Sequence, residues 1–175
     1  MENTGLVHIY TGDGKGKTTA AVGLAVRCAG AGGRVLFSRF LKSNDSGELN
    51  VLSKIPGITV MDNPKVFHMI HLKGKVPEGA AEYYKERFEG TVSEAMKGEY
   101  DLLVMDEIIA TVNYGFVSVS ELLDFLKEKP RNLETVLTGR DPAAQLLEAA
   151  DYVSEIKKVK HPFDKGIVAR EGIEY

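Results

Sequence analysis

The chain has 175 residues, enough for one α/β domain with its own core and too few for two. Hydrophobic residues make up 43% and charged residues 27% of it, which is typical of a globular protein. The formal charge of -3 favours neither a nucleic-acid partner nor a membrane surface. No basic-then-apolar leader begins the chain, and no run approaches the roughly 20 apolar residues of a membrane span. We therefore predict a single cytoplasmic domain over residues 1–175.

Strand-like apolar runs alternate with helical stretches along the chain. The expected strands are Leu6–Tyr10, Arg34–Phe40, Ile58–Met61, Asp101–Met105, Thr135–Thr138 and Tyr152–Ile156. The expected helices are one from about Thr18 to Ala29, Ala81–Lys97, Glu121–Lys127 after a Ser118-x-x-Glu121 capping box, and one from an Asp141-Pro142 N-cap to Ala150. Several strand runs are continuously apolar, which is typical of strands covered on both faces. The pattern predicts an α/β fold with a mostly parallel, doubly wound sheet and a ligand site at the carboxyl ends of the strands.

A glycine-rich stretch directly follows the first expected strand. It reads Thr11-Gly12-Asp13-Gly14-Lys15-Gly16-Lys17-Thr18-Thr19. In a P-loop, the backbone N–H groups of such a turn and the N-terminus of the next helix hold a polyphosphate. Lys17 would add a mobile positive charge, and the Thr18 hydroxyl would ligate Mg²⁺. Thr11 stands where G-x-x-x-x-G-K-[ST] has its first glycine and Gly12 comes one residue late, so we interpret the stretch as an atypical P-loop.

Two further segments are predicted to reach the same edge of the sheet. The run Asp101–Met105 ends in Asp106 and Glu107, where P-loop proteins bind Mg²⁺ directly or through water. The sequence does not decide between these two carboxylates. Arg140, in Thr138-Gly139-Arg140, would brace phosphate oxygens, with a surface salt bridge as the alternative.

Two stretches have no regular pattern, Lys42–Glu48 and Asn63–Glu78, and we expect long loops there. The second contains His68 and His71 in an H-x-x-H arrangement. A metal site at these histidines is not favoured, because no third ligand stands at a matching spacing.

The chain resembles the P-loop corrinoid adenosyltransferases, which act on cob(I)alamin or cob(I)yrinic acid a,c-diamide. The resemblance extends from Gly5 to Tyr175 and is carried by TGDGKGKTTAA, VMDE, TGR and EAADYVSEIKKVKHPFDKGIVAREGIEY. It implies a RecA-like P-loop fold and a cytoplasmic homodimer. It also implies ATP, Mg²⁺ and a corrinoid as ligands and an electron-donating reductase as a partner, with no nucleic-acid or membrane partner.

The reaction implied by the resemblance is transfer of the 5′-deoxyadenosyl group of ATP to Co(I) of a reduced corrinoid, with release of triphosphate, in adenosylcobalamin biosynthesis or salvage. Catalytic roles would fall to Lys17 and Arg140, ATP binding to Thr11–Thr19, and Mg²⁺ to Thr18 with Asp106 or Glu107. Cobalt is the nucleophile, which suits a chain without an evident nucleophile–base pair.

Two other segments correspond to family features with differences. The aromatic loop that covers the lower face of the corrinoid falls at Lys65–Leu72, where Phe67 is the one Phe, Tyr or Trp. The family's QF-K-G…GE stretch falls at 39–48, with Arg39 in place of glutamine and Ser43 in place of glycine.

Two other function classes stay open from the residues alone. A P-loop ATPase or small-molecule kinase would present the terminal phosphate to water or a hydroxyl. A non-catalytic nucleotide or corrinoid carrier would bind without forming a cobalt–carbon bond.

Overall fold

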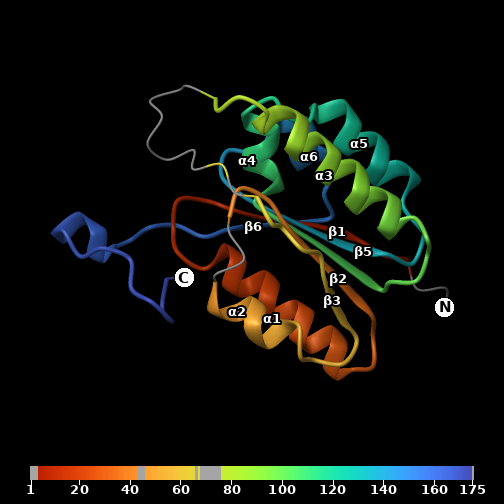
Figure 1. The fold of residues 1–175 in the computed structure, drawn as a ribbon, viewed down its shortest axis with the longest axis horizontal. Coiled ribbons are helices and arrows are strands. Elements are labelled where there is room, and N and C mark those ends of the chain that lie inside the picture. Colours follow the sequence, from red (N-terminus) through yellow and green to blue (C-terminus); the bar gives the residue numbers. More distant parts are fainter. Residues whose placement is uncertain (1–3, 43–45, 66, 68–75, 175) are drawn as a thin grey trace.

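A single parallel sheet organises the protein (Figure 1). The computed structural model describes residues 4–42, 46–65, 67 and 76–174. Six strands lie in the order β3-β2-β4-β5-β1-β6, and every pair is parallel. Their bounds are β1 Val7–Thr11, β2 Val35–Arg39, β3 Ile58–Val60, β4 Leu102–Asp106, β5 Glu134–Thr138 and β6 Tyr152–Glu155. The expected α/β fold is confirmed and is consistent with a RecA-like P-loop domain.

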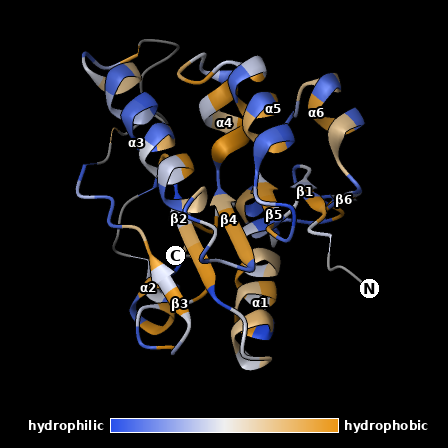
Figure 2. Ribbon diagram, turned by 90° about the vertical axis from the view of Figure 1, so that its right-hand side faces the viewer, coloured by the Kyte–Doolittle hydropathy of each residue, from blue (hydrophilic) through white to orange (hydrophobic). Residues whose placement is uncertain are grey.

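Helices cover both faces of this sheet (Figure 2). On one face lie α1 Lys17–Gly30 and α2 Gly47–Leu52. On the other lie α3 Ala80–Ala95, α4 Ile108–Asn113, α5 Val119–Glu128 and α6 Ala144–Ala149. A 3-10 turn, η1 Pro162–Lys165, lies in the segment after β6.

The two-sided cover explains why the strand runs are apolar at every position. Successive strand residues point to opposite faces. In β4, Leu103 and Met105 join the core cluster that includes α3 to α6, whereas Leu102 and Val104 join the cluster that includes α1 and α2. Both sets are buried, so the central strands show no polar alternation.

The register brings four strand ends to one edge. Arg39 at the end of β2 is paired with Asp106 at the end of β4, and Thr138 at the end of β5 is paired with Tyr10 of β1. The P-loop leaves β1 at this same edge (Figure 1). The topology therefore gathers the predicted site segments without any help from long loops.

One predicted helix boundary is wrong. The helix expected from Asp141-Pro142 to Ala150 begins at Ala144, with Ala143 as its N-cap. Asp141 has a left-handed φ of 50°, and Asn113 Nδ2 donates to the carbonyl oxygens of Arg140 (2.9 Å) and Asp141 (3.3 Å). These long-range bonds hold the segment as a turn, which outweighs the local capping pattern.

The remaining predictions concern the other helices, the two histidines and membrane spans. The capping box of Ser118 and Glu121 is present and opens α5. The short helices α2 and α4 were not predicted. His68 and His71 lie outside the described residues. Among the helices in the described ranges, none is long and apolar enough to cross a bilayer.

The central position of β4 predicts a steep cost for truncating its side chains. Leu103→Ala should lower the free energy of unfolding by about 2–5 kcal/mol, because Leu103 is fully buried and leaves a cavity. Leu147→Ala, on the exposed side of α6, should change it by roughly 0.5 kcal/mol or less. Urea denaturation measures both, and equal losses would contradict the assigned core.

Candidate functional site

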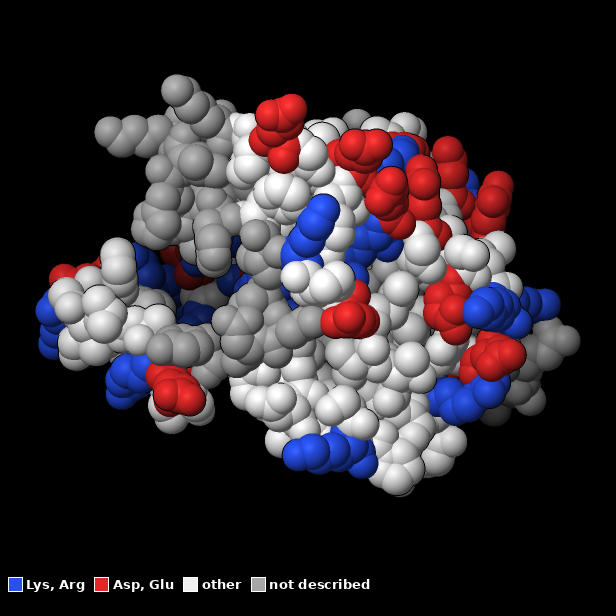
Figure 3. All heavy atoms as spheres, viewed as in Figure 1, with Lys and Arg blue, Asp and Glu red and all other residues white. Residues whose placement is uncertain are grey.

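A cavity of about 910 Å³ lies at the carboxyl edge of the sheet. Its walls come from the P-loop, the end of β2, the start of α2, Glu107, Arg140 and the C-terminal segment. In the space-filling view, lysine and arginine atoms with acidic atoms beside them are visible in the hollow next to this segment (Figure 3). The cavity is therefore strongly charged, as a site for a polyphosphate and a cation would be.

The P-loop is docked on the backbone that follows β6. Gly14 N donates to Ile156 O at 2.8 Å, and Lys158 N donates to Asp13 Oδ1 at 2.9 Å. A Cβ on Gly12 would lie 2.4 Å from Ile156 O, and one on Gly14 would lie 2.7 Å from it. Gly12 also has a φ of 106°. The shifted glycine is thus required by close backbone packing, a role that the loop pattern alone did not indicate.

Lys17 is folded into its own loop. Its Nζ donates to Gly12 O at 2.8 Å and to Gly14 O at 2.9 Å. Burial, and then the nearby positive charge of Arg140, lower the pKa of Lys17. The side chain therefore sits inside the loop, where phosphate oxygens would compete with the two carbonyls for it.

Asp106 is the buried centre of the site. Its Oδ1 accepts hydrogen bonds from Thr18 Oγ1 (2.9 Å) and Thr138 Oγ1 (2.7 Å). Glu107 N donates in turn to Thr138 Oγ1 at 2.8 Å. Glu107 has a left-handed φ of 64° and lines the cavity. One carboxylate therefore fixes the P-loop threonine while the next faces the cavity.

The oxygens of Thr18, Asp106 and Glu107 suit a hard cation such as Mg²⁺. Asp106 Oδ2 is buried and accepts no hydrogen bond from the described part of the chain. Within those same residues, no group of three or more histidine, cysteine, aspartate or glutamate side chains is placed to hold a metal by itself. A metal held here would need the Thr18 hydroxyl and ligand oxygens to complete its coordination.

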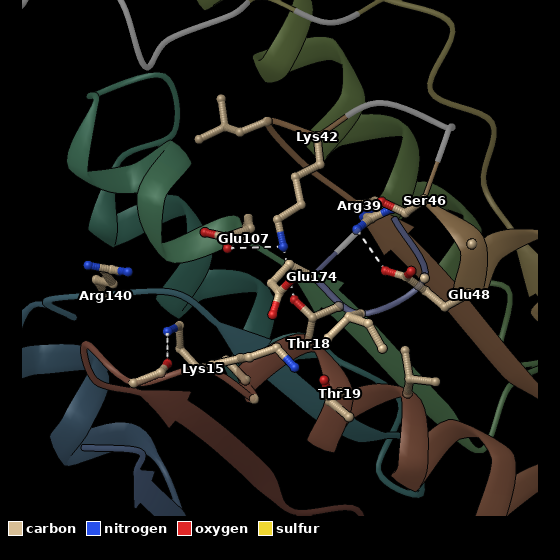
Figure 4. Close-up of a pocket in the computed structure, with 18 of the residues that line it drawn as sticks. Lys15, Thr18, Thr19, Arg39, Lys42, Ser46, Glu48, Glu107, Arg140 and Glu174 are labelled. Carbon is tan, nitrogen blue, oxygen red and sulfur yellow. Dashed lines mark hydrogen bonds and ion pairs between the residues drawn. The ribbon is translucent and has the colours of Figure 1, made fainter. Parts of the chain in front are cut away.

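Arg39 stands where the resemblance expects glutamine. Its side chain is 2% exposed; Nη2 lies 2.9 Å from Glu48 Oε1, and Nε lies 3.4 Å from Asp106 Oδ2 (Figure 4). The arginine thus forms part of the floor of the cavity and places positive charge against Asp106.

Arg87, on α3, is a structural residue that the sequence analysis missed. Its Nε donates to Arg39 O at 2.5 Å and its Nη1 donates to Asp62 O at 2.6 Å, so it ties the last residue of β2 to the chain just after β3. Burial lowers the pKa of Arg87. The sequence offered one signal for this residue, because an arginine one turn after Tyr84 on the apolar face of the expected helix indicates a buried, hydrogen-bonded side chain.

Phe67 lies apart from the cavity, against two tyrosines of α3. The ring centroids of Phe67 and Tyr83 are 5.7 Å apart, and those of Phe67 and Tyr84 are 5.9 Å apart. The chain thus supplies two further aromatic rings beside Phe67 from a helix. The rest of the expected loop, apart from Lys65, lies outside the described residues.

The fold and cavity define a protein of the parallel α/β class, consistent with a RecA-like P-loop domain. A sequence model described as ATP:corrinoid adenosyltransferase BtuR/CobO/CobP matches residues 3–175, and the chain belongs to this family. A corrinoid adenosyltransferase of Escherichia coli (strain K12) is 33% identical over all of this chain and 88% of its own length. The corrinoid adenosyltransferase CobA of Salmonella typhimurium is 31% identical with the same coverage. A corrinoid adenosyltransferase of a Sinorhizobium species is 32% identical over 99% of this chain and 82% of its own length.

The docking of the P-loop on the C-terminal segment can be tested with a glycine pair. Gly12→Ala should lower the melting temperature and weaken ATP binding at least about tenfold, because its Cβ would collide with Ile156 O at a positive φ. Gly23→Ala, on α1 with nothing within 4 Å of the new methyl group, should be neutral or stabilising by up to about 1 kcal/mol. Calorimetric titration and thermal melts measure both, and unimpaired ATP binding by Gly12→Ala would refute the docking argument.

Proposed function

We propose that this protein transfers the 5′-deoxyadenosyl group of ATP to Co(I) of a reduced corrinoid and releases triphosphate. The observation that carries the proposal is the charged cavity at the edge of the sheet. It brings together the P-loop, Glu107 and Arg140, and family membership supplies the acceptor.

Binding of the triphosphate would fall to the loop Thr11–Thr19. Residues 13–19 of this loop, which include the first turn of α1, line the cavity, and Lys17 would exchange two carbonyl partners for phosphate oxygens. Arg140 lines the same cavity and would brace the same group (Figure 4). When the C5′–O bond breaks, charge develops on the leaving triphosphate, and preorganised donors lower the barrier by stabilising it.

We assign the Mg²⁺ position to Thr18 and Glu107, with Asp106 orienting the Thr18 hydroxyl. Support comes from the geometry: Glu107 lines the cavity, whereas Asp106 is buried beneath it and bonded to Thr18. A bound Mg²⁺ supplies charge neutralisation for the leaving triphosphate.

The corrinoid side would involve Phe67 together with Tyr83 and Tyr84. The acceptor carries its own nucleophile, so the protein needs to exclude water and position the two substrates instead of activating a side chain. We further propose a single domain over residues 1–175, a cytoplasmic homodimer and an electron-donating reductase as partner, all on the strength of the family.

Product analysis tests the reaction. ATP, Mg²⁺ and chemically reduced corrinoid should yield a light-sensitive cobalt–carbon bond and triphosphate in equal amounts. ADP as the nucleotide product would favour a kinase or ATPase, and binding without either product would favour a carrier.

Lys17 provides the matching test of the phosphate site. Lys17→Ala should reduce turnover by about 10²–10³, because one preorganised positive donor to the leaving group is lost. Full activity in this variant, measured by single-turnover kinetics, would refute the placement of the triphosphate.

Phe67 tests the corrinoid side separately. Phe67→Ala should impair the corrinoid step while leaving ATP affinity near normal, and Phe67→Tyr should retain most activity because the ring remains. Steady-state kinetics in both substrates distinguish these effects. Equal losses toward ATP and corrinoid would count against the assigned role.

A further inference from the structure

Lys42 projects into the nucleotide cavity from the chain after β2 (Figure 4). Its Nζ lies 3.0 Å from Thr18 Oγ1, 3.3 Å from Glu107 Oε1 and 3.7 Å from Asp106 Oδ2. These are the three residues whose oxygens suit a divalent cation. The ammonium group therefore occupies the position at which such an ion would find its ligands.

The position of Lys42 is built into the fold. The preceding residue, Leu41, packs against the core with a φ of 56°, a conformation that non-glycine residues seldom adopt. Buried Asn63 donates from Nδ2 to Lys42 O at 2.7 Å, and Tyr83 OH donates to Asn63 Oδ1 at 2.7 Å. Strained backbone held by surrounding contacts is a feature of functional sites.

The charges around Lys42 explain why a cation is needed there. Asp106 and Glu107 place two carboxylates side by side, and the buried Arg39 already shares its charge between Asp106 and Glu48. Lys15, Lys17, Arg140 and Glu174 line the same cavity. An ammonium and a divalent ion a few ångströms apart repel strongly in such a pocket, so the two compete for the same oxygens.

We propose that Lys42 is a tethered cation that fills the metal position while nucleotide is absent and leaves it when a divalent ion arrives with a triphosphate. This inference rests on the metal position assigned above. The flexible four-carbon stem of lysine allows the displaced ammonium to turn to phosphate oxygens in the same cavity. The pocket then rejects a free divalent ion and accepts the metal–nucleotide complex.

Titration of the nucleotide-free protein with Mn²⁺, with free ion counted by electron paramagnetic resonance, tests this role. Lys42→Met should bind Mn²⁺ about tenfold more tightly than the unaltered protein. Lys15 lines the same cavity, and among the described residues no hydrogen bond or ion pair joins it to Asp106 or Glu107. Lys15→Met should therefore change Mn²⁺ affinity by about twofold or less. Lys42→Arg keeps the positive charge, and its Mn²⁺ affinity should stay as weak as that of the unaltered protein. Lys42→Gln replaces Lys42→Met if the latter does not fold.

The affinity for metal-free ATP, measured in EDTA, should move in the opposite direction. Lys42→Met should weaken it several-fold, because the displaced ammonium no longer meets the phosphates. If Lys42 had a purely structural role, its replacement would weaken the binding of both Mn²⁺ and metal-free ATP. Unchanged Mn²⁺ affinity in folded Lys42→Met, or an equal gain in Lys15→Met, would overturn the inference.

A double variant separates this inference from the assigned metal position. Adding Glu107→Gln to Lys42→Met should remove the gain in Mn²⁺ affinity. This result would support both the role of Lys42 and the assigned metal position. If the gain survives without the Glu107 carboxylate, the ion binds elsewhere, and the metal assignment and the role of Lys42 both fail. If neither Lys42→Met nor Lys42→Gln gains Mn²⁺ affinity, the role of Lys42 fails. The proposal of adenosyl transfer, which is tested by its products, is then unaffected.

Discussion

The site depends on the buried carboxylate of Asp106. An ionised carboxylate removed from water is costly unless hydrogen bonds and opposite charge compensate it. Here Thr18 and Thr138 supply hydroxyl donors and Arg39 supplies charge, so that the first turn of α1 and the ends of β2 and β5 are tied to the end of β4. Each of these segments carries or adjoins a residue of the cavity. Compensating this one buried carboxylate thereby assembles the cavity.

The P-loop depends on a second constraint, its contact with the backbone after β6. Gly12 and Gly14 face Ile156 so closely that a methyl group at either would overlap its carbonyl. The loop is therefore shaped by protein backbone on one side and remains open to the cavity on the other. This suits a reaction in which the nucleophile arrives on the acceptor and the protein's main task is to hold a charged leaving group.

A chain of contacts connects Phe67 with the cavity at the edge of the sheet. Phe67 packs on Tyr83, whose hydroxyl orients Asn63, and Asn63 holds the backbone of Lys42 at the cavity. The aromatic cluster and the cavity are thus linked by one short chain of contacts. Phe67 is the one aromatic residue of its expected loop, but it does not stand alone in the structure. The helix α3 adds two aromatic rings beside it.

The sequence by itself determined the parallel sheet, the glycine-rich turn between β1 and α1, and the strand-end carboxylates, because continuous apolar runs and a glycine-rich turn are local patterns. It missed α2 and α4, since helices of six residues are too short to show a period. The prediction that Asp141 caps a helix was wrong, because Asn113, which is distant in the chain, holds this segment as a turn. Only the tertiary structure placed Arg87 against the end of β2 and Lys42 beside Thr18 and Glu107. Those positions depend on contacts between residues far apart in sequence, and no local pattern records which of them will meet.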